Sequence, residues 1–259
     1  MMRMLGLPKK KKEKLKVACR TASETGAVRK ENEDHVFVDD AKTLFCVADG
    51  MGGGSEGARA SEIVCEELAK VASGDFAARI ESVDAAIAAA NARILRYARE
   101  KGFKQMGSTV ALLAVDPADA SRAVIGHVGD SRVYRVRGGT AELLTSDHTI
   151  GGQLSAFAKG RQADELKNRA NPLAHVLTRA IGVEPKLSVE WHKVDVREDD
   201  LFLVCSDGVH DVISDAQVGE ILSAAPDLDA AVKALSAQVV ACGAPDNYSF
   251  VIVRFGGAK

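Results

Sequence analysis

The chain has 259 residues and a formal net charge of −2, with 46% hydrophobic and 27% charged residues. This composition is typical of a soluble globular protein that is long enough to bury a large core, and we expect one domain. The near-neutral charge gives no electrostatic case for a nucleic-acid partner, and no apolar run approaches the roughly 18 residues of a membrane span.

In chain order, apolar or β-branched runs bounded by turn residues predict strands at 36–38, 44–48, 110–115, 123–128, 133–136, 187–194, 201–205 and 250–255. Apolar residues at helical spacing predict one pair of helices at 58–72 and 83–99 and a second pair at 215–225 and 229–241. Several links between strands are too short for a parallel crossover, so we expect largely antiparallel sheets. Paired helices between groups of strands indicate an α+β fold with helical layers packed on these sheets.

Two segments stand apart from this pattern. Residues 1–15 contain the run Lys9-Lys10-Lys11-Lys12 after a short apolar stretch, an order that is wrong for a signal peptide, and we predict a flexible basic tail ahead of a domain at 16–259. Residues 149–174 have few large apolar side chains, and we predict a partly helical flap inserted beside the functional site.

The cysteines are odd in number, scattered and without a CxxC pair; they are Cys19, Cys46, Cys65, Cys205 and Cys242. This usage predicts reduced thiols and a cytoplasmic protein, which we expect to be a monomer.

Two of the predicted strands run into Asp-Gly, at Asp49-Gly50 and at Asp207-Gly208. An Asp-Gly pair after a short apolar run predicts a turn that leaves a carboxylate at the rim of a sheet. Three further acidic segments border strand-like runs: Asn32-Glu33-Asp34, Gly129-Asp130-Ser131 and Asp246-Asn247. So many carboxylates repel one another unless cations neutralise them, which predicts a site for divalent metals.

The donor types narrow the choice of metal. Carboxylate oxygens without a supporting set of His or Cys residues favour magnesium, manganese or calcium over zinc. The histidines show no paired ligand spacing, so we interpret His127 and His148 as structural hydrogen-bonding residues.

Arg29 lies five residues before Asp34. A guanidinium beside a carboxylate and metal cluster can hold two oxygens of a phosphoryl group, whereas the alternative is an arginine paired with a carboxylate or with solvent. The spacing of Gly52, Gly54 and Gly57 matches a dinucleotide-binding loop, but the antiparallel strands and the second helix that follows argue against that interpretation. No cysteine phosphate loop and no Gly-x-Ser-x-Gly elbow is present, which leaves water activated by a metal as the expected nucleophile.

Eight short segments occur in this order along the chain: Arg29-Lys30-Glu31-Asn32-Glu33-Asp34, Ala48-Asp49-Gly50-Met51-Gly52-Gly53, Gly107-Ser108-Thr109, His127-Val128-Gly129-Asp130-Ser131-Arg132, Leu144-Thr145-Ser146-Asp147-His148, Leu177-Thr178-Arg179-Ala180-Ile181-Gly182, Cys205-Ser206-Asp207-Gly208-Val209 and Asp246-Asn247. Taken together, they resemble the motifs of the metal-dependent protein phosphatase 2C family in its bacterial form.

The resemblance implies a four-layer αββα sandwich and hydrolysis of phosphoserine and phosphothreonine in proteins, including a serine/threonine kinase, by in-line attack of a hydroxide that bridges two Mn²⁺ or Mg²⁺ ions. The resemblance also implies a role for each site residue. By this resemblance Asp49 bridges both ions, the Gly50 carbonyl binds the second, and Asp207 and Asp246 hold the first. It further implies that Glu33 and Asp34 act mostly through waters, that Asp130 with Asp207 binds a third, weaker ion, and that Arg29 clamps the phosphate.

The sequence departs from the family pattern at two positions. Met51 stands where animal members have a histidine that is a proposed acid for the leaving group, and Gly54 stands where many bacterial members have a histidine. Two alternatives stay open on other grounds. Motifs can be kept in a catalytically silent phosphatase-like module for binding or regulation, and a site exposed at a rim also suits a phosphatase of a small phosphoester.

Overall fold

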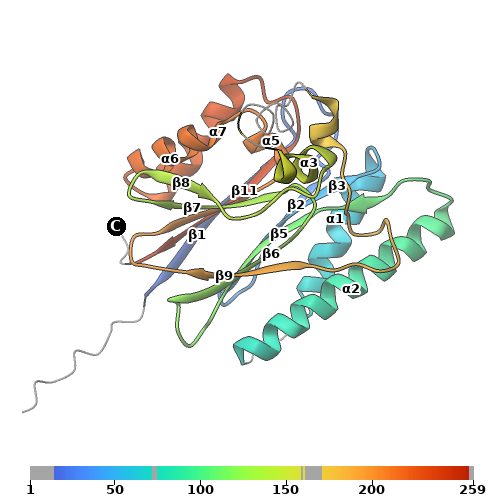
Figure 1. Ribbon diagram of the computed structural model, residues 1–259, viewed down its shortest axis with the longest axis horizontal. Coiled ribbons are helices and arrows are strands. Elements are labelled where there is room, and N and C mark those ends of the chain that lie inside the picture. The colour runs from blue at the N-terminus through green and yellow to red at the C-terminus, as the bar shows by residue number, and fades with distance from the viewer. Residues whose placement is uncertain (1–14, 72–74, 159, 161–170, 257–259) are drawn as a thin grey trace, which may run out of the picture.

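The computed structural model describes residues 15–71, 75–158, 160 and 171–256, so nearly all of the predicted basic tail lies outside the described residues. Two antiparallel sheets form the centre of the molecule (Figure 1). The first has the strand order β1 (Val17–Glu24), β11 (Tyr248–Phe255), β10 (Leu201–Cys205), β7 (Arg132–Arg137), β8 (Thr140–Leu143). The second has the order β2 (Asp34–Val38), β3 (Leu44–Met51), β5 (Val110–Val115), β6 (Arg122–Val128), β9 (Glu190–Asp195), and β4 (Gly107–Ser108) pairs with the end of β3.

Helices cover the outer faces of both sheets. Helices α1 (Ser55–Leu68) and α2 (Phe76–Lys101) lie below the second sheet in Figure 1, and α6 (Asp215–Ala224) and α7 (Leu228–Ala241) lie above the first. Three short elements lie near one edge of the sandwich: α3 (Ile150–Phe157), the 3₁₀ helix η1 (Pro172–His175) and α5 (Asp207–His210).

Alternation of side chains along the strands explains why their sequences are apolar throughout. In β3, Phe45 and Val47 pack between the two sheets, whereas Leu44 and Cys46 pack under α1 and α2. Strand β10 alternates in the same way between the inter-sheet core and the core under α6 and α7. Strands buried on both faces read as continuous apolar runs. The α+β fold and the αββα layers expected from the sequence are thus confirmed.

The prediction that the Asp-Gly pairs turn the chain is wrong at Asp49-Gly50, because strand β3 continues through this pair to Met51. At Asp207-Gly208 the chain does leave the strand, since β10 ends at Cys205 and Asp207 is the first residue of the short helix α5. The glycines are needed for close packing: a Cβ on Gly50 would lie 2.0 Å from the Gly57 carbonyl oxygen, and one on Gly208 would lie 1.9 Å from the Asn247 carbonyl oxygen. In both places backbone packs directly on backbone behind the carboxylate.

The described part of the predicted flap at 149–174 consists of α3, capped by the Thr149 side chain, and of η1. Its residues 159 and 161–170 lie outside the described residues. Within the described part of the chain, no helix combines the length and apolarity that crossing a membrane requires.

Candidate metal centre

A cavity of about 270 Å³ opens at the edge where the two sheets meet, and we call it the carboxylate pocket. Its lining contains seven of the eight predicted site residues: Arg29, Glu33, Asp49, Gly50, Asp130, Asp207 and Asp246. The eighth, Asp34, is only 4% exposed and stands opposite Asp49 in the β2–β3 register.

The carboxylates come from both sheets. Asp34 begins β2 and Asp49 lies near the end of β3, in the second sheet. Asp130 occupies the link between β6 and β7, Asp207 follows β10, and Asp246 precedes β11 by two residues. The edges of two packed sheets therefore place five segments that are far apart in sequence around one cavity.

Burial and mutual repulsion disfavour the charged forms of these groups. Burial raises the pKa of Asp34 to about 7 and the pKa of Asp130 to about 8, and Asp207 adds to both shifts. Burial, followed by the charge of Asp34 and of Asp207, holds the pKa of Asp49 far above its usual range. A cluster with these properties favours positive charge in the pocket.

The donor set fits a hard divalent cation. Apart from the Arg29 guanidinium and the His175 imidazole, the polar groups of the lining offer mainly carboxylate and carbonyl oxygens, the ligands that Mg²⁺ and Mn²⁺ prefer. Among the described residues, the buried Oδ1 of Asp34 has no hydrogen-bond partner, although buried carboxylate oxygens are normally satisfied. An ion or its waters would satisfy that oxygen.

Arg29 is paired with a carboxylate, which is the alternative that its sequence position left open. Its Nη2 donates to Asp246 Oδ2 at 2.7 Å, and this hydrogen bond is the main reason why the pKa of Arg29 is raised. The backbone N–H of Asn247 donates to Asp246 Oδ1 at 2.8 Å. Both oxygens of Asp246 therefore already accept a hydrogen bond.

Sequence reasoning missed the residues that hold these carboxylates in place. The Ser206 hydroxyl donates to Asp34 Oδ2 at 2.7 Å, and Asn247 Oδ1 accepts from the Glu33 backbone N–H at 2.9 Å. The Thr109 hydroxyl accepts from the Asp49 backbone N–H at 3.1 Å. Each lies within one of the quoted motifs, but spacing alone carries no signal for such a bond.

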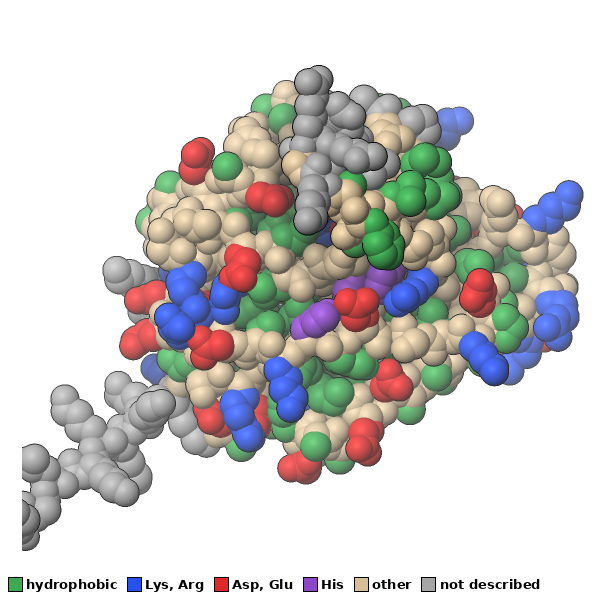
Figure 2. Space-filling view, viewed as in Figure 1, with side chains coloured by type: hydrophobic (Ala, Val, Ile, Leu, Met, Phe, Trp, Pro, Cys, Tyr) green, Lys and Arg blue, Asp and Glu red, His purple; other side chains and the backbone are tan. Residues whose placement is uncertain are grey.

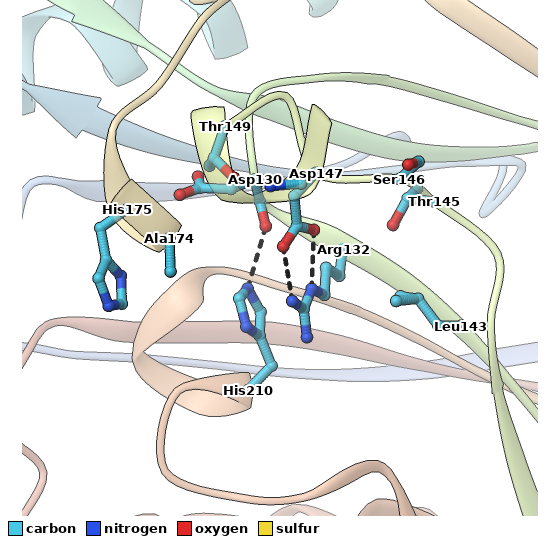
Figure 3. Close-up of a pocket in the computed structure, with 11 residues that line it drawn as sticks. Asp130, Arg132, Leu143, Thr145, Ser146, Asp147, Thr149, Ala174, His175 and His210 are labelled. Atoms are coloured by element: carbon cyan, nitrogen blue, oxygen red, sulfur yellow. Dashed lines mark hydrogen bonds and ion pairs between the residues drawn. The ribbon is translucent and has the colours of Figure 1, made fainter. Parts of the chain in front are cut away.

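A smaller cavity of about 80 Å³ adjoins the carboxylate pocket, and Asp130 and His175 line both (Figure 3). Here the Arg132 guanidinium donates two hydrogen bonds to the Asp147 carboxylate, from Nε to Oδ1 at 2.8 Å and from Nη2 to Oδ2 at 2.6 Å. His210 Nε2 donates to the Asp130 carbonyl oxygen at 3.0 Å. These contacts fix the link that carries Asp130 against α5 and against the segment before α3.

A second group of ligand-type side chains, His127, His148 and Glu190, has its ligand atoms within 4.8 Å of one another. The two imidazole rings stack with centroids 4.5 Å apart, so their lone pairs do not converge on one point as metal ligands require. The Gly129 N–H donates to His148 Nδ1 at 3.2 Å, and His148 Nε2 therefore donates to Glu190 Oε2 at 3.1 Å. This group supports the β6–β7 link by hydrogen bonds.

Comparison with known proteins gives one consistent result. Residues 25–243 match the sequence profile of a family described as protein phosphatase 2C. The chain is 31% identical over 241 residues to the serine/threonine phosphatase stp of Listeria innocua, covering 90% of this chain and 93% of that protein. It is 32% identical over 238 residues to the serine/threonine protein phosphatase PstP of Mycobacterium tuberculosis, covering 89% of this chain and 43% of PstP.

A solved structure agrees with these matches. The catalytic domain of the serine/threonine protein phosphatase PstP in complex with two manganese ions superposes with a TM-score of 0.79 and 29% identity, covering 94% of this chain and all of that one.

Proposed function

The chain belongs to the protein phosphatase 2C family, and we propose that it is a serine/threonine protein phosphatase that works with two Mn²⁺ or Mg²⁺ ions in the carboxylate pocket. The observation that carries this proposal is the gathering of Asp49, Asp130, Asp207 and Asp246 with Arg29 around one open cavity. The described lining contains no cysteine or serine, and its carboxylates are grouped as a cation site, which favours direct attack by water activated by a metal.

The pocket residues have distinct roles in this proposal. Asp49 would hold both ions, and the Gly50 carbonyl would contribute to the second. Asp207 and Asp246 would hold the first ion, and Asp130 with Asp207 would hold a third, weaker one. Glu33 and Asp34 act through waters, consistent with the burial of Asp34 behind Asp49. When bound, the ions lower the pKa of a coordinated water, so that hydroxide is available near neutral pH.

Arg29 is the phosphate clamp of the proposed site. It is half-exposed at the mouth of the pocket, and a guanidinium can donate two parallel hydrogen bonds to phosphoryl oxygens. Since it now bonds Asp246, ion binding at Asp246 would free it to turn toward the substrate.

His175 supplies the proton for the leaving alkoxide. Among the described residues it is the histidine that lines the pocket, and its Nδ1 lies 3.5 Å from Asp211 Oδ2, at the end of the helix that carries Asp207. In this proposal the Asp211 carboxylate orients the ring, and the imidazole acts as the general acid for the leaving oxygen. This arrangement fills the role that Met51 cannot fill.

Phosphorylated proteins, including a serine/threonine kinase, are the proposed substrates, and the proposed location is the cytoplasm. The cysteines, all free, are compatible with a reducing compartment. A silent binding module would be expected to have lost some of these carboxylates.

The test is hydrolysis of a phosphothreonine peptide by the purified protein with added Mn²⁺, with EDTA, and by Asp49→Ala and Asp207→Asn. We expect activity that needs the metal and both carboxylates. Hydrolysis of sugar phosphates but not of phosphopeptides would favour a small phosphoester as the substrate. Binding of Mn²⁺ without any hydrolysis would favour the silent module.

A further inference from the structure

Two further cavities open beside the carboxylate pocket and meet it at Met51. The larger cavity, of about 490 Å³, also has Leu177 in common with the carboxylate pocket. The smaller cavity, of about 440 Å³, has Val183 in common with the larger one. We call these two adjoining cavities the basic groove. A peptide whose phosphoresidue enters the carboxylate pocket must continue over the neighbouring surface, and the groove offers more room than the 80 Å³ cavity on the side of Asp130 and His175.

The lining of the groove is positive. Arg179 and Lys186 line one cavity, Arg99 and Lys104 line the other, and Glu184 is the acidic residue among them. The whole chain carries a net charge of −2, so this excess is local. Figure 2 shows basic side chains around the end of α2, on the same face as the histidine group.

Most of this charge is available to a ligand. Among the described residues, Arg99, Lys104 and Lys186 form no ion pair within 4 Å, and all three are exposed. Arg179 has a carboxylate neighbour, with its Nη1 3.9 Å from Glu190 Oε2. Charges at an open rim attract and orient a partner of opposite sign.

The segment 182–186, which forms one wall of the groove, is held in place by hydrogen bonds to α2. The buried Asn91 of α2 donates from Nδ2 to the Glu184 carbonyl oxygen at 2.9 Å, and its Oδ1 accepts from the Gly182 N–H at 2.6 Å. Gly182 has φ +88° and packs on Ile94. The segment that carries Val183 and Lys186 is therefore held against α2 before any ligand binds, which lowers the entropic cost of binding.

From this geometry we infer that the basic groove binds acidic side chains that flank the phosphoresidue of a protein substrate, so that the favoured substrates are phosphothreonine or phosphoserine segments rich in Asp and Glu. The inference rests on the proposed function. Met51 and Leu177, at the junction with the carboxylate pocket, contact the apolar parts of the segment, and the basic side chains lie farther out.

The experiment compares two phosphothreonine peptides, one with acidic and one with basic flanks, for hydrolysis by the wild-type protein with Mn²⁺ and for binding to Asp207→Asn by fluorescence anisotropy. We expect kcat/KM and affinity about tenfold higher for the acidic peptide at low salt, and a smaller difference at high salt. Lys104→Glu/Lys186→Glu should abolish or reverse the preference, with p-nitrophenyl phosphate hydrolysis unchanged.

Lys193→Glu/Lys233→Glu is the matched control, since both lysines are exposed and neither lines the groove. The control should keep the preference of the wild type. Equal handling of the two peptides by the wild type, a preference that survives in Lys104→Glu/Lys186→Glu, or an equal loss of preference in the control would overturn the inference. Failure of the wild type to hydrolyse either peptide would count against the proposed function, and the binding comparison would still decide the role of the groove.

Discussion

At the scale of single residues, Asp246 connects the two halves of the proposed chemistry. Its oxygens accept from Arg29 and from the Asn247 backbone. In the proposed site the guanidinium and a cation would therefore compete for the same carboxylate. This competition would link phosphate binding to metal binding, because the side chain that a cation would displace is the one proposed to hold the phosphate.

We therefore predict that Arg29→Ala binds Mn²⁺ slightly more tightly while it loses activity. The gain in affinity should be about threefold, since the pair is half-exposed, and kcat/KM for a phosphopeptide should fall about 10²-fold with the lost donor. Titration calorimetry and steady-state kinetics measure the two effects. Arg20→Ala, which removes the exposed pair with Asp229, is the control and should change neither. Weaker Mn²⁺ binding in Arg29→Ala would contradict the competition.

The proposed role of His175 as the general acid is tested with two substrates, because a general acid speeds the reaction only when the leaving group is poor. His175→Gln should lower kcat for a phosphothreonine peptide about 10²-fold, and it should leave p-nitrophenyl phosphate hydrolysis nearly unchanged, since nitrophenolate leaves without a proton. His210, which lines the neighbouring cavity but not the carboxylate pocket, provides the control: His210→Gln removes a hydrogen bond to the Asp130 carbonyl oxygen and should affect both substrates alike. Equal losses for both substrates in His175→Gln would exclude the role.

At the scale of elements, both Asp-Gly pairs let a neighbouring backbone segment pack closely beside a carboxylate of the pocket. Each places a carboxylate at the pocket while its glycine lets a neighbouring backbone pass close behind, the Gly57 carbonyl in one case and the Asn247 carbonyl in the other. The carboxylates are thus positioned by rigid backbone contacts rather than by flexible turns.

Gly208→Ala tests this contact. A Cβ there would lie 1.9 Å from the Asn247 oxygen, so α5 and the start of β11 must move apart, and we predict a loss of about 3 kcal/mol in the free energy of unfolding. Gly243→Ala is the comparison, because its φ is +95° but nothing lies within 4 Å of the added Cβ. That variant should lose only about 1 kcal/mol from backbone strain. Urea denaturation measures both, and similar losses would show that the contact relaxes easily.

The sequence predicted the buried elements well and the edges poorly. Residues 110–115 and 201–205 are strands with the predicted bounds, because a doubly buried strand must be apolar throughout. Strands β1 and β8 were missed, since they form the two edges of one sheet and carry mixed, partly exposed sequences. Helix α2 begins seven residues earlier than predicted, at Phe76 after the capping Asp75, because its first turns have little apolar periodicity.

For the site, the motifs predicted which carboxylates gather but not what supports them. Seven predicted residues line one pocket, whereas the bond from Ser206 to Asp34 and the pair of Arg29 with Asp246 depend on contacts between residues more than 170 positions apart. His175 has no motif signal of its own, and only the fold brings it to the pocket.

At the scale of the whole molecule, the sandwich concentrates negative charge at one edge of a well-packed core. Folding brings Asp34 and Asp130 out of water, and their pKa values rise from 3.8 to about 7 and about 8. The folded state therefore binds more protons than the unfolded state between these limits, and the stability of the metal-free protein must fall as pH rises through this range.

We predict that the EDTA-treated protein has a lower melting temperature at pH 8 than at pH 6.5. The comparison starts at pH 6.5 because burial lowers the pKa of three histidines below that value; they are His35, His127 and His148. In more acidic solution these histidines make the stability rise with pH, which would oppose the effect of the carboxylates. Divalent ions should reverse this fall in stability with pH, because they bind the ionised carboxylates. At a concentration of 100 times the Kd they add about 2.7 kcal/mol to the free energy of unfolding. Differential scanning calorimetry with and without Mg²⁺ gives both effects, and Asp130→Asn should flatten the pH dependence. A melting temperature that is unchanged from pH 6.5 to 8 in EDTA would mean that the folded protein tolerates these buried charges without a cation.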